Sequence, residues 1–315
     1  MSIEQGTVAA VVPRVVVVLG AGEIGSGWAA LFAAYGAEVR VVDPAPTALD
    51  RAHESLLIAR SLLARRAPRR APPHHPLADV YPAQSKHAPT ENVLATRPGR
   101  ITAAPLDEAV EGAGWIQESL PERIDLKRAA LKGLERLSTH EAIIASSTAT
   151  LTASIIAEGF SFAPRLLVVH PLHPVYAVPI VEISAGRHTD PETVDRAAEV
   201  LRALGREPVI IRGEPPGLVA NRLTAALLRE ALDLVANGVI SPASVDRIVA
   251  RGIATGWAAT GPFATEMIRR RGAASAATSE RAWAELLARI LDAANVRLTP
   301  DVPWPEMQFP RADLP

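Results

Sequence analysis

The sequence predicts an α/β protein in which a doubly wound, mainly parallel sheet is followed by a smaller all-α domain. The apolar run at 15–19, VVVVL, leads into a glycine-rich turn, a helical pattern and a second strand at 37–43, which is a β–turn–α–β unit. Short apolar runs then alternate with helical patterns as far as residue 212, whereas residues beyond 214 show helical periodicity alone.

Composition excludes several classes of function. The 315 residues carry a net charge of −1, so no global field points to nucleic acid or to a membrane surface. The absence of cysteine excludes disulfides, thiolate nucleophiles and cysteine-based metal sites. No apolar run approaches the roughly 20 residues that span a bilayer, and the first residues do not resemble a signal peptide. We therefore expect a cytoplasmic protein.

The elements of the first half follow from their apolar spacing. Residues 28–35 have helical spacing, and Gly36 is a plausible helix stop. The expected elements after them are a helix at 48–63, a strand that starts at Trp115 and an amphipathic helix from Glu122 to Leu137. Between these, residues 64–98 are rich in proline and arginine, which predicts an irregular surface excursion.

The second half predicts further strands and then helices only. Strands are expected at 142–146, 165–170, 179–184 and 208–212, with a helix from Leu151 and another entered through TDPET. Helices are expected at 218–236, at 242–251 and between 262 and 294. The predicted domains are thus 1–214, 215–298 and a Pro-rich tail at 299–315.

The glycine-rich turn predicts a dinucleotide site. Gly20, Gly22 and Gly25 spell G-x-G-x-x-G directly after a buried strand and at the start of a helix, where they allow a tight turn, a close approach of pyrophosphate and close helix packing. Asp43 follows at the end of the next strand, where it would accept hydrogen bonds from a ribose and repel a 2′-phosphate, so NAD is favoured over NADP. The alternative is a glycine turn without a ligand.

A histidine and a run of hydroxyls mark two further strand ends. His170 ends one apolar strand, and the hydroxyl-rich stretch 146–154 follows another. In a doubly wound sheet such ends border the ligand crevice. Glu182 lies twelve residues after His170 and could orient it as the general base that hydride transfer from an alcohol requires. A single histidine at a strand end is otherwise more often structural.

Several motifs together resemble the 3-hydroxyacyl-CoA dehydrogenase family. They are VLGAGEIGSGWAALFAAYGAEVRVVD, IQESLPERIDLKRAAL, SSTATL, HPLHPVYAVPIVEI and GLVANRLTAALLREALDLVANGVISPASVD. The chain looks most similar to the branch with L-gulonate 3-dehydrogenase (lambda-crystallin) and carnitine dehydrogenase. The resemblance implies a Rossmann-type NAD-binding domain, a helical dimerisation domain and a homodimer. It also implies NAD-linked oxidation of a 3-hydroxyl to a 3-oxo group.

The resemblance also implies roles for particular residues. His170 matches the family's catalytic base, Glu182 its partner, and Asn221 the residue that hydrogen-bonds the substrate oxygen. The implied contacts with the cofactor are Glu23, Ile24, Glu122, Lys127 and Ser147, together with Gly20, Gly22, Gly25 and Asp43 of the dinucleotide motif. The structural alternatives are that Asn221 only caps a helix and that Glu122 and Lys127 form a surface pair.

Three departures from the family pattern bear on activity. Ala149 stands where the family has its catalytic serine, 21 residues before His170. His173 replaces the usual asparagine and is a turn residue, a second titrating group or a substrate contact. The Pro- and Arg-rich stretch 64–98 replaces a helical pair that helps to hold acyl-CoA, so its arginines either meet an anionic substrate or form a solvated loop.

The sequence therefore predicts an NAD-dependent oxidoreductase. Its substrate would be a 3-hydroxyacyl-CoA or a small 3-hydroxy acid resembling L-gulonate, carnitine or 3-hydroxybutyrate, and the altered crevice favours the small acid. The alternative is a catalytically impaired NAD-binding relative with a structural or regulatory role, because Ala149 lacks the hydroxyl. No metal site is expected, since the adjacent His74 and His75 lack the spacing and partners of one.

Overall fold

The computed structural model describes residues 11–65, 94–137, 141–258, 261–262 and 265. Most of the predicted excursion at 64–98, the predicted helices between 262 and 294 and the tail at 299–315 lie outside these residues. The described chain divides into two compact units, of which the first runs as far as Leu228 and the second starts at Arg229.

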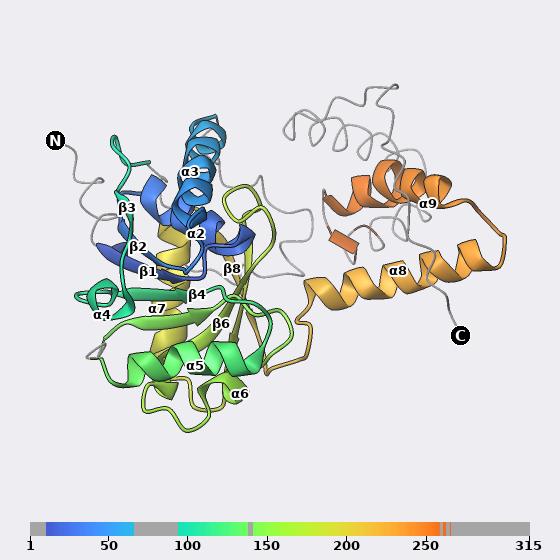
Figure 1. Cartoon of the computed structure of the whole chain (residues 1–315). Coiled ribbons are helices and arrows are strands. Elements are labelled where there is room, and N and C mark those ends of the chain that lie inside the picture. Colours follow the sequence, from blue (N-terminus) through green and yellow to red (C-terminus); the bar gives the residue numbers. More distant parts are fainter. Residues whose placement is uncertain (1–10, 66–93, 138–140, 259–260, 263–264, 266–315) are drawn as a thin grey trace, which may run out of the picture. The chain divides into compact units, whose positions relative to one another are not determined.

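The first unit contains an eight-stranded sheet in the order β3-β2-β1-β4-β5-β6-β7-β8 (Figure 1). The strands are β1 (Val15–Leu19), β2 (Glu38–Val42), β3 (Ile101–Ala103), β4 (Trp115–Glu118), β5 (Ile143–Ser146), β6 (Leu166–Pro171), β7 (Ile180–Ala185) and β8 (Glu207–Ile211). Only β6 and β7 pair antiparallel. The order reverses between β1 and β4, so the predicted doubly wound, mainly parallel sheet is confirmed, and its switch point lies beside the glycine turn.

Helices cover both faces of this sheet (Figure 1). One face packs against α2 (Glu23–Ala34), α3 (Ala48–Ala64) and α7 (Pro191–Ala203). The other packs against α4 (Leu106–Ala109), α5 (Ile124–Glu135), α6 (Ala153–Ala157) and the 3-10 turn Ala163–Arg165. Two layers of helices bury both faces, which explains why β1 reads as a continuous apolar run.

Helix α2 is the most buried helix of this unit. Every residue from Gly25 to Ala34 is buried, because α2 lies between the sheet and α3. The Phe32 ring packs between Trp28 and Trp115, with centroid distances of 6.0 and 5.6 Å. Aromatic side chains of this size dominate the stability of a core, so they fix the helix firmly behind the glycine turn.

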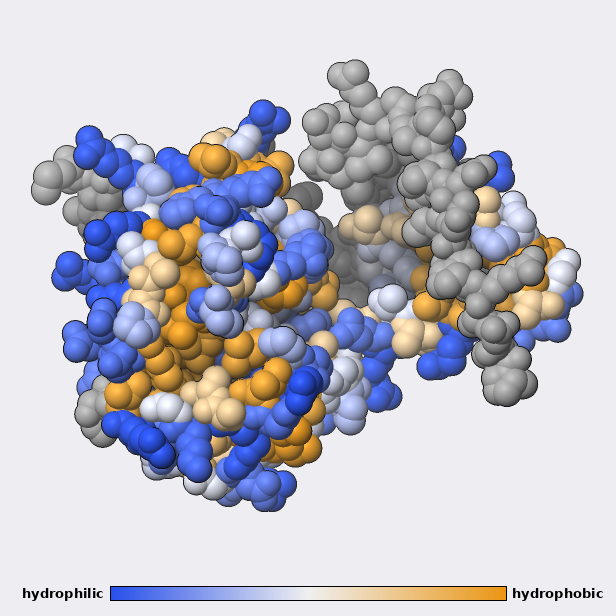
Figure 2. All heavy atoms as spheres, viewed as in Figure 1, coloured by the Kyte–Doolittle hydropathy of each residue, from blue (hydrophilic) through white to orange (hydrophobic). Residues whose placement is uncertain are grey.

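The helical region contains α8 (Ala220–Ala236), α9 (Pro242–Ile248) and a π-helical turn at Val249–Ile253. The Ser241 side chain caps α9 by accepting from the Ser244 amide. None of these helices has a buried residue, and apolar surface is visible along α8 in Figure 2. A helical region after the α/β domain was predicted and is confirmed.

Short elements were the ones that sequence reasoning missed. β3 has three residues and α4 has four, too few to show a periodicity. Helix α6 starts at Ala153, after the expected Leu151, because the Thr152 side chain accepts from the Ile155 amide and caps the helix there. No helix among the described residues has the length and apolar character needed to cross a membrane.

Candidate active site

The glycine turn has the geometry that a dinucleotide requires. Gly20 has φ +83°, a conformation that residues with a side chain rarely adopt. A Cβ on Gly25 would lie 1.8 Å from the Gly20 carbonyl oxygen, so only glycine lets α2 approach the turn. A Cβ on Gly22 would meet no atom within 4 Å. The first amides of α2, including those of Glu23 and Ile24, therefore border open space, as an anion site at a helix N-terminus requires.

Asp43 is tied to the same turn. Its Oδ2 accepts a hydrogen bond of 2.6 Å from the Ala21 amide, and its Oδ1 accepts one of 2.7 Å from the Ala45 amide. Each oxygen keeps a second lone pair for a ribose hydroxyl. Arg51, which the sequence did not single out, donates from Nε to the Ala21 carbonyl and braces the turn from α3.

His170 and Glu182 are neighbours across the antiparallel pair of β6 and β7. His170 Nδ1 lies 3.0 Å from Glu182 Oε2, and both side chains are largely buried. A carboxylate accepts from an Nδ1–H, so this contact selects the tautomer whose Nε2 carries a lone pair. The arrangement can take up a proton at Nε2, and the carboxylate would stabilise the resulting imidazolium.

Glu182 also holds the start of α8. Its Oε1 accepts from the amides of Val219, at 2.9 Å, and Ala220, at 3.0 Å. The carboxylate thus satisfies donors that a helix N-terminus leaves unpaired. Asn221 is the next residue along the helix, and its side chain is exposed and lies outside the lining of the cavity described below. Glu182 therefore connects His170 to the turn of α8 that carries Asn221.

Glu122 organises the turn that follows β5. Its Oε1 accepts from the Thr148 and Thr150 hydroxyls at 2.5 and 2.7 Å, and from the amides of Ala149 and Thr150 at 3.2 and 2.9 Å. Burial raises the pKa of Glu122, but these bonds and the charge of Lys127 outweigh it and lower the pKa from 4.5 to about 2. Glu122 is therefore a permanent anion at neutral pH.

Lys127 binds the buried carboxylate of Glu118, which was not among the residues expected from the sequence. Its Nζ lies 2.8 and 3.1 Å from the two oxygens of Glu118 and 3.1 Å from the Leu120 carbonyl oxygen. These acceptors match the three donors of an ammonium group. Glu122 Oε2 is farther away, at 3.5 Å. Lys127 and Glu118 thus anchor the 119–123 segment, and Ser146 adds a hydrogen bond to Glu118.

Ser147 lies at the centre of a polar network beside the glycine turn. Its Oγ receives hydrogen bonds from Trp28 Nε1 at 3.2 Å and Gln117 Nε2 at 2.9 Å. Ser119 Oγ lies 2.8 Å from it. Polar residues within a fully buried strand are a signal in themselves, and Gln117 and Glu118 could have been singled out in the sequence on that ground.

His173 pairs with the first residue of α2. Its Nε2 lies 3.0 Å from Glu23 Oε1, and both side chains are substantially exposed. The sequence left open whether His173 is a turn residue, a second titrating group or a substrate contact. The contact with Glu23 places it at the rim of the glycine turn. It brings the loop after β6 into contact with the start of the dinucleotide helix.

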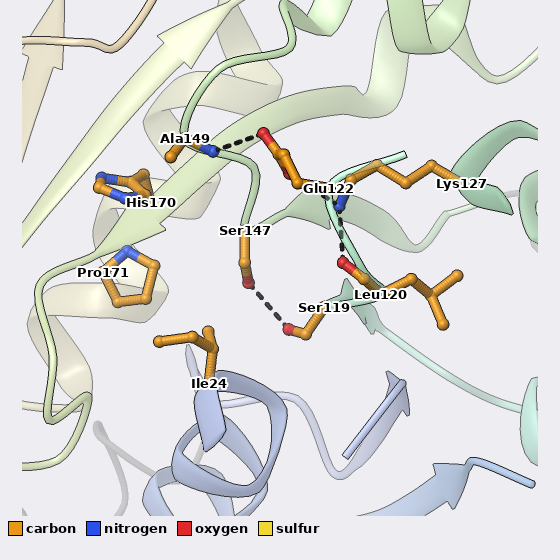
Figure 3. Close-up of a pocket in the computed structure, with 9 residues that line it drawn as sticks. All are labelled: Ile24, Ser119, Leu120, Glu122, Lys127, Ser147, Ala149, His170 and Pro171. Carbon is orange, nitrogen blue, oxygen red and sulfur yellow. Dashed lines mark hydrogen bonds and ion pairs between the residues drawn. The ribbon is translucent and has the colours of Figure 1, made fainter. Parts of the chain in front are cut away.

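A cavity of about 250 Å³ lies among several of these groups. It is lined by Ile24, Ser119, Leu120, Glu122, Lys127, Ser147, Ala149, His170 and Pro171 (Figure 3). Ala149 and His170 lie together on one side, while Ser147 and Ser119 point toward each other near Ile24. The cavity therefore runs from the dinucleotide helix to the histidine, and the described residues contain no cluster that could hold a metal ion.

The residues fit NAD. Gly22 leaves open space above the amides of α2, Asp43 offers acceptors at the end of β2, and the cavity continues from Ile24 to His170. When bound, NAD+ supplies the hydride acceptor. The fold and the site together define an NAD-dependent oxidoreductase.

Comparison with known families agrees with this class. Residues 15–214 match the NAD binding domain of 3-hydroxyacyl-CoA dehydrogenase, and residues 217–296 match the C-terminal domain of the same enzyme. The chain belongs to the 3-hydroxyacyl-CoA dehydrogenase family, whose members oxidise CH–OH groups with NAD, and the predicted family and cofactor are confirmed.

Two relatives and one solved structure show how far the similarity extends along the chain. The chain is 38% identical over 247 residues to an L-carnitine dehydrogenase of Pseudomonas sp, covering 78% of this chain and 70% of that protein. It is 35% identical to L-carnitine dehydrogenase of Bacillus cereus, covering 79% and 70%. A solved 3-hydroxyacyl-CoA dehydrogenase from Archaeoglobus fulgidus superposes with a TM-score of 0.60 at 26% identity, covering 80% and 73%. The similarity thus extends over most of each chain, in sequence and in fold.

Proposed function

We propose that the protein oxidises the 3-hydroxyl of a small 3-hydroxy acid to a 3-oxo group, with His170 as the general base. The observation that carries the proposal is the 3.0 Å contact between His170 Nδ1 and Glu182, at a cavity that also reaches the dinucleotide helix. Nε2 would take the hydroxyl proton as the carbon loses its hydride. Glu182 would keep the imidazole in that tautomer and stabilise its protonated form.

The remaining roles follow from position. Asn221 would donate a hydrogen bond to the substrate oxygen from the first turn of α8, which Glu182 holds through the two preceding amides. Gly20, Gly22, Gly25, Glu23 and Ile24 would receive the pyrophosphate, and Asp43 the ribose. Ser147 would face the nicotinamide. Glu122 and Lys127 would act mainly through the loops that they hold in place.

The substrate proposal rests on the relatives and on the altered crevice. The two relatives reported above are named L-carnitine dehydrogenases, and carnitine is a 3-hydroxy acid without coenzyme A. We therefore place small acids such as carnitine, L-gulonate and 3-hydroxybutyrate ahead of 3-hydroxyacyl-CoA esters. A catalytically impaired NAD-binding role is the second candidate, because Ala149 brings no hydroxyl to the cavity wall.

One experiment separates the two candidates. NADH formation is measured with these acids and with 3-hydroxybutyryl-CoA, for the native protein and for His170→Ala, with His188→Ala as an exposed control. Removing the base should lower kcat about 10²–10⁴-fold and leave NADH binding intact. The impaired role would be established if the native protein bound NADH without turning over any substrate, and if His170→Ala bound NADH equally well.

We further propose that residues 1–214 form the NAD-binding domain, with 64–98 as an excursion, that 215–298 form a helical dimerisation domain and that 299–315 form a tail. The last strand, β8, ends at Ile211, which supports the first boundary. The exposed apolar residues of α8 support a homodimer through this region. A cytoplasmic location stays a prediction from the cysteine-free composition.

A further inference from the structure

Ser119 stands at the point where the strand order of the sheet reverses. It directly follows β4, next to β1 and its glycine turn. A Cβ on Gly20 would lie 2.9 Å from the Ser119 carbonyl oxygen, and one on Gly25 would lie 3.2 Å from the Ser119 Cβ. Ser119 therefore packs against the turn that receives the dinucleotide, and it also lines the cavity that leads to His170.

The direction of the hydrogen bonds that lead to Ser119 can be deduced from groups that can only donate. Trp115 Nε1, which can only donate, lies 2.9 Å from Gln117 Oε1. The oxygen of the Gln117 amide must therefore face Trp115. Its nitrogen is left to donate to the Ala145 carbonyl, at 3.3 Å, and to Ser147 Oγ, at 2.9 Å.

Ser147 then has only one possible direction for its proton. Its oxygen has two lone pairs, which accept from Gln117 Nε2 and from Trp28 Nε1. With both lone pairs in use, Ser147 cannot also accept from Ser119, so it donates to Ser119 Oγ across 2.8 Å. The proton of Ser119 finds no acceptor among the described residues, and Ser119 lies in the cavity wall.

We propose that Ser119 is a cofactor-binding residue whose hydroxyl donates a hydrogen bond to an oxygen of the nicotinamide–ribose half of NAD. The buried chain of donors from Trp115, Gln117 and Trp28 through Ser147 sets this direction. This inference rests on the proposed function: with the pyrophosphate on the amides of α2 and the nicotinamide directed along the cavity toward His170, the nicotinamide riboside would be the part of NAD that passes Ser119. Its acceptors there would be a ribose hydroxyl and the carboxamide oxygen.

The first test measures binding of NADH, ADP-ribose and AMP to the full-length protein and to Ser119→Ala by calorimetry. Loss of one neutral donor should raise the Kd of NADH about three- to tenfold and leave the Kd of AMP unchanged. A parallel loss for ADP-ribose assigns the bond to the ribose, whereas unchanged ADP-ribose binding assigns it to the carboxamide. Unchanged NADH binding, or an equal loss for AMP, overturns the proposal. Binding needs no turnover, so this result is independent of the role of His170.

The second test asks whether the hydrogen bonds of Ser147 set the direction of the Ser119 hydroxyl. Trp28→Phe frees one lone pair on Ser147, so the Ser119 proton can turn inward. NADH affinity should fall by less than in Ser119→Ala, and the double variant should be no weaker than Ser119→Ala alone. Strictly additive losses, or a lower melting temperature with unchanged NADH affinity in Trp28→Phe, would contradict the directional network. Thr193→Val serves as the control, because it removes a buried hydroxyl of α7 that donates to the Pro164 carbonyl and does not line the cavity, so it should not alter NADH affinity.

Discussion

Ala149 is one of the three positions at which the sequence departs from the pattern of the family that it resembles. It lines the cavity beside His170 (Figure 3). The neighbouring hydroxyls of Thr148 and Thr150 both donate to Glu122, so neither is directed at a substrate near His170. The Thr148 and Thr150 hydroxyls therefore stabilise the turn itself, and Ala149 presents only a methyl group to the reaction cavity.

We expect Ala149→Ser to raise kcat on a family-typical substrate such as 3-hydroxybutyryl-CoA. One added donor beside the reacting oxygen is worth about 10²–10³ in rate when it is well placed, and a grafted serine should recover about tenfold or more. Steady-state NADH formation measures the effect, with Ala129→Ser on the exposed side of α5 as the matched control. A fall in turnover on the native substrate would instead mean that the alanine makes room for part of that substrate.

At the level of elements, strand ends, helix starts and one turn carry the site. The β6–β7 pair sets His170 opposite Glu182, and Glu182 in turn holds the start of α8. The start of α5 contributes Lys127, which fixes the loop that carries Glu122. Glu122 then fixes the turn from Thr148 to Leu151. Each carboxylate thus joins two segments that are distant in sequence, which makes these contacts sensitive to charge.

Stability should depend on pH through Glu122. Its pKa is lowered in the folded state to about 2 from 4.5, so the unfolded chain binds the proton more readily. The contribution of Glu122 is therefore complete above about pH 4.5, falls as the pH drops, and is lost near pH 2. Glu122→Gln should lower the melting temperature at pH 7, and its difference from the native protein should shrink between pH 4.5 and 2.

Unfolding of both proteins at pH 7, 4 and 3 tests this prediction, and the comparison isolates Glu122 from the other carboxylates. Glu54→Gln, at an exposed position in the interior of α3, is the matched control variant. A difference between native protein and Glu122→Gln that stays constant from pH 7 to 3 would show that the turn does not depend on the ionised carboxylate.

For the molecule as a whole, the notable feature of α8 is that its apolar side chains are exposed. Leu223 and Leu227, on one face of the helix, are 63% and 37% exposed, and Leu228 and Leu232, on another face, are 56% and 60% exposed. An amphipathic helix normally buries its apolar side chains. Exposed apolar patches of this kind mark interaction surfaces. This surface is the physical basis of the proposed homodimer.

Leu228→Glu should therefore convert a dimer into monomers, because a charge cannot be buried unpaired in an apolar interface. Light scattering coupled to gel filtration measures the molar mass. Asp233→Asn, a change at a polar position of the same helix, should leave the mass unchanged. A native protein that is already monomeric, or a Leu228→Glu variant with the native mass, would disprove an interface at α8.

The sequence by itself determined the local part of this protein. Apolar runs and helical spacing predicted most strands and the long helices, since these patterns depend on neighbours along the chain. The glycine motif, His170 and Glu182 could likewise be found from their positions along the chain, whereas Ala149 stands out only through the resemblance to the family. Only the tertiary structure decided that Glu122 binds the turn around Ala149, that Lys127 serves Glu118, and that Ser147 must donate to Ser119. These contacts join residues far apart in sequence, and their direction depends on which donors and acceptors the fold has already brought together.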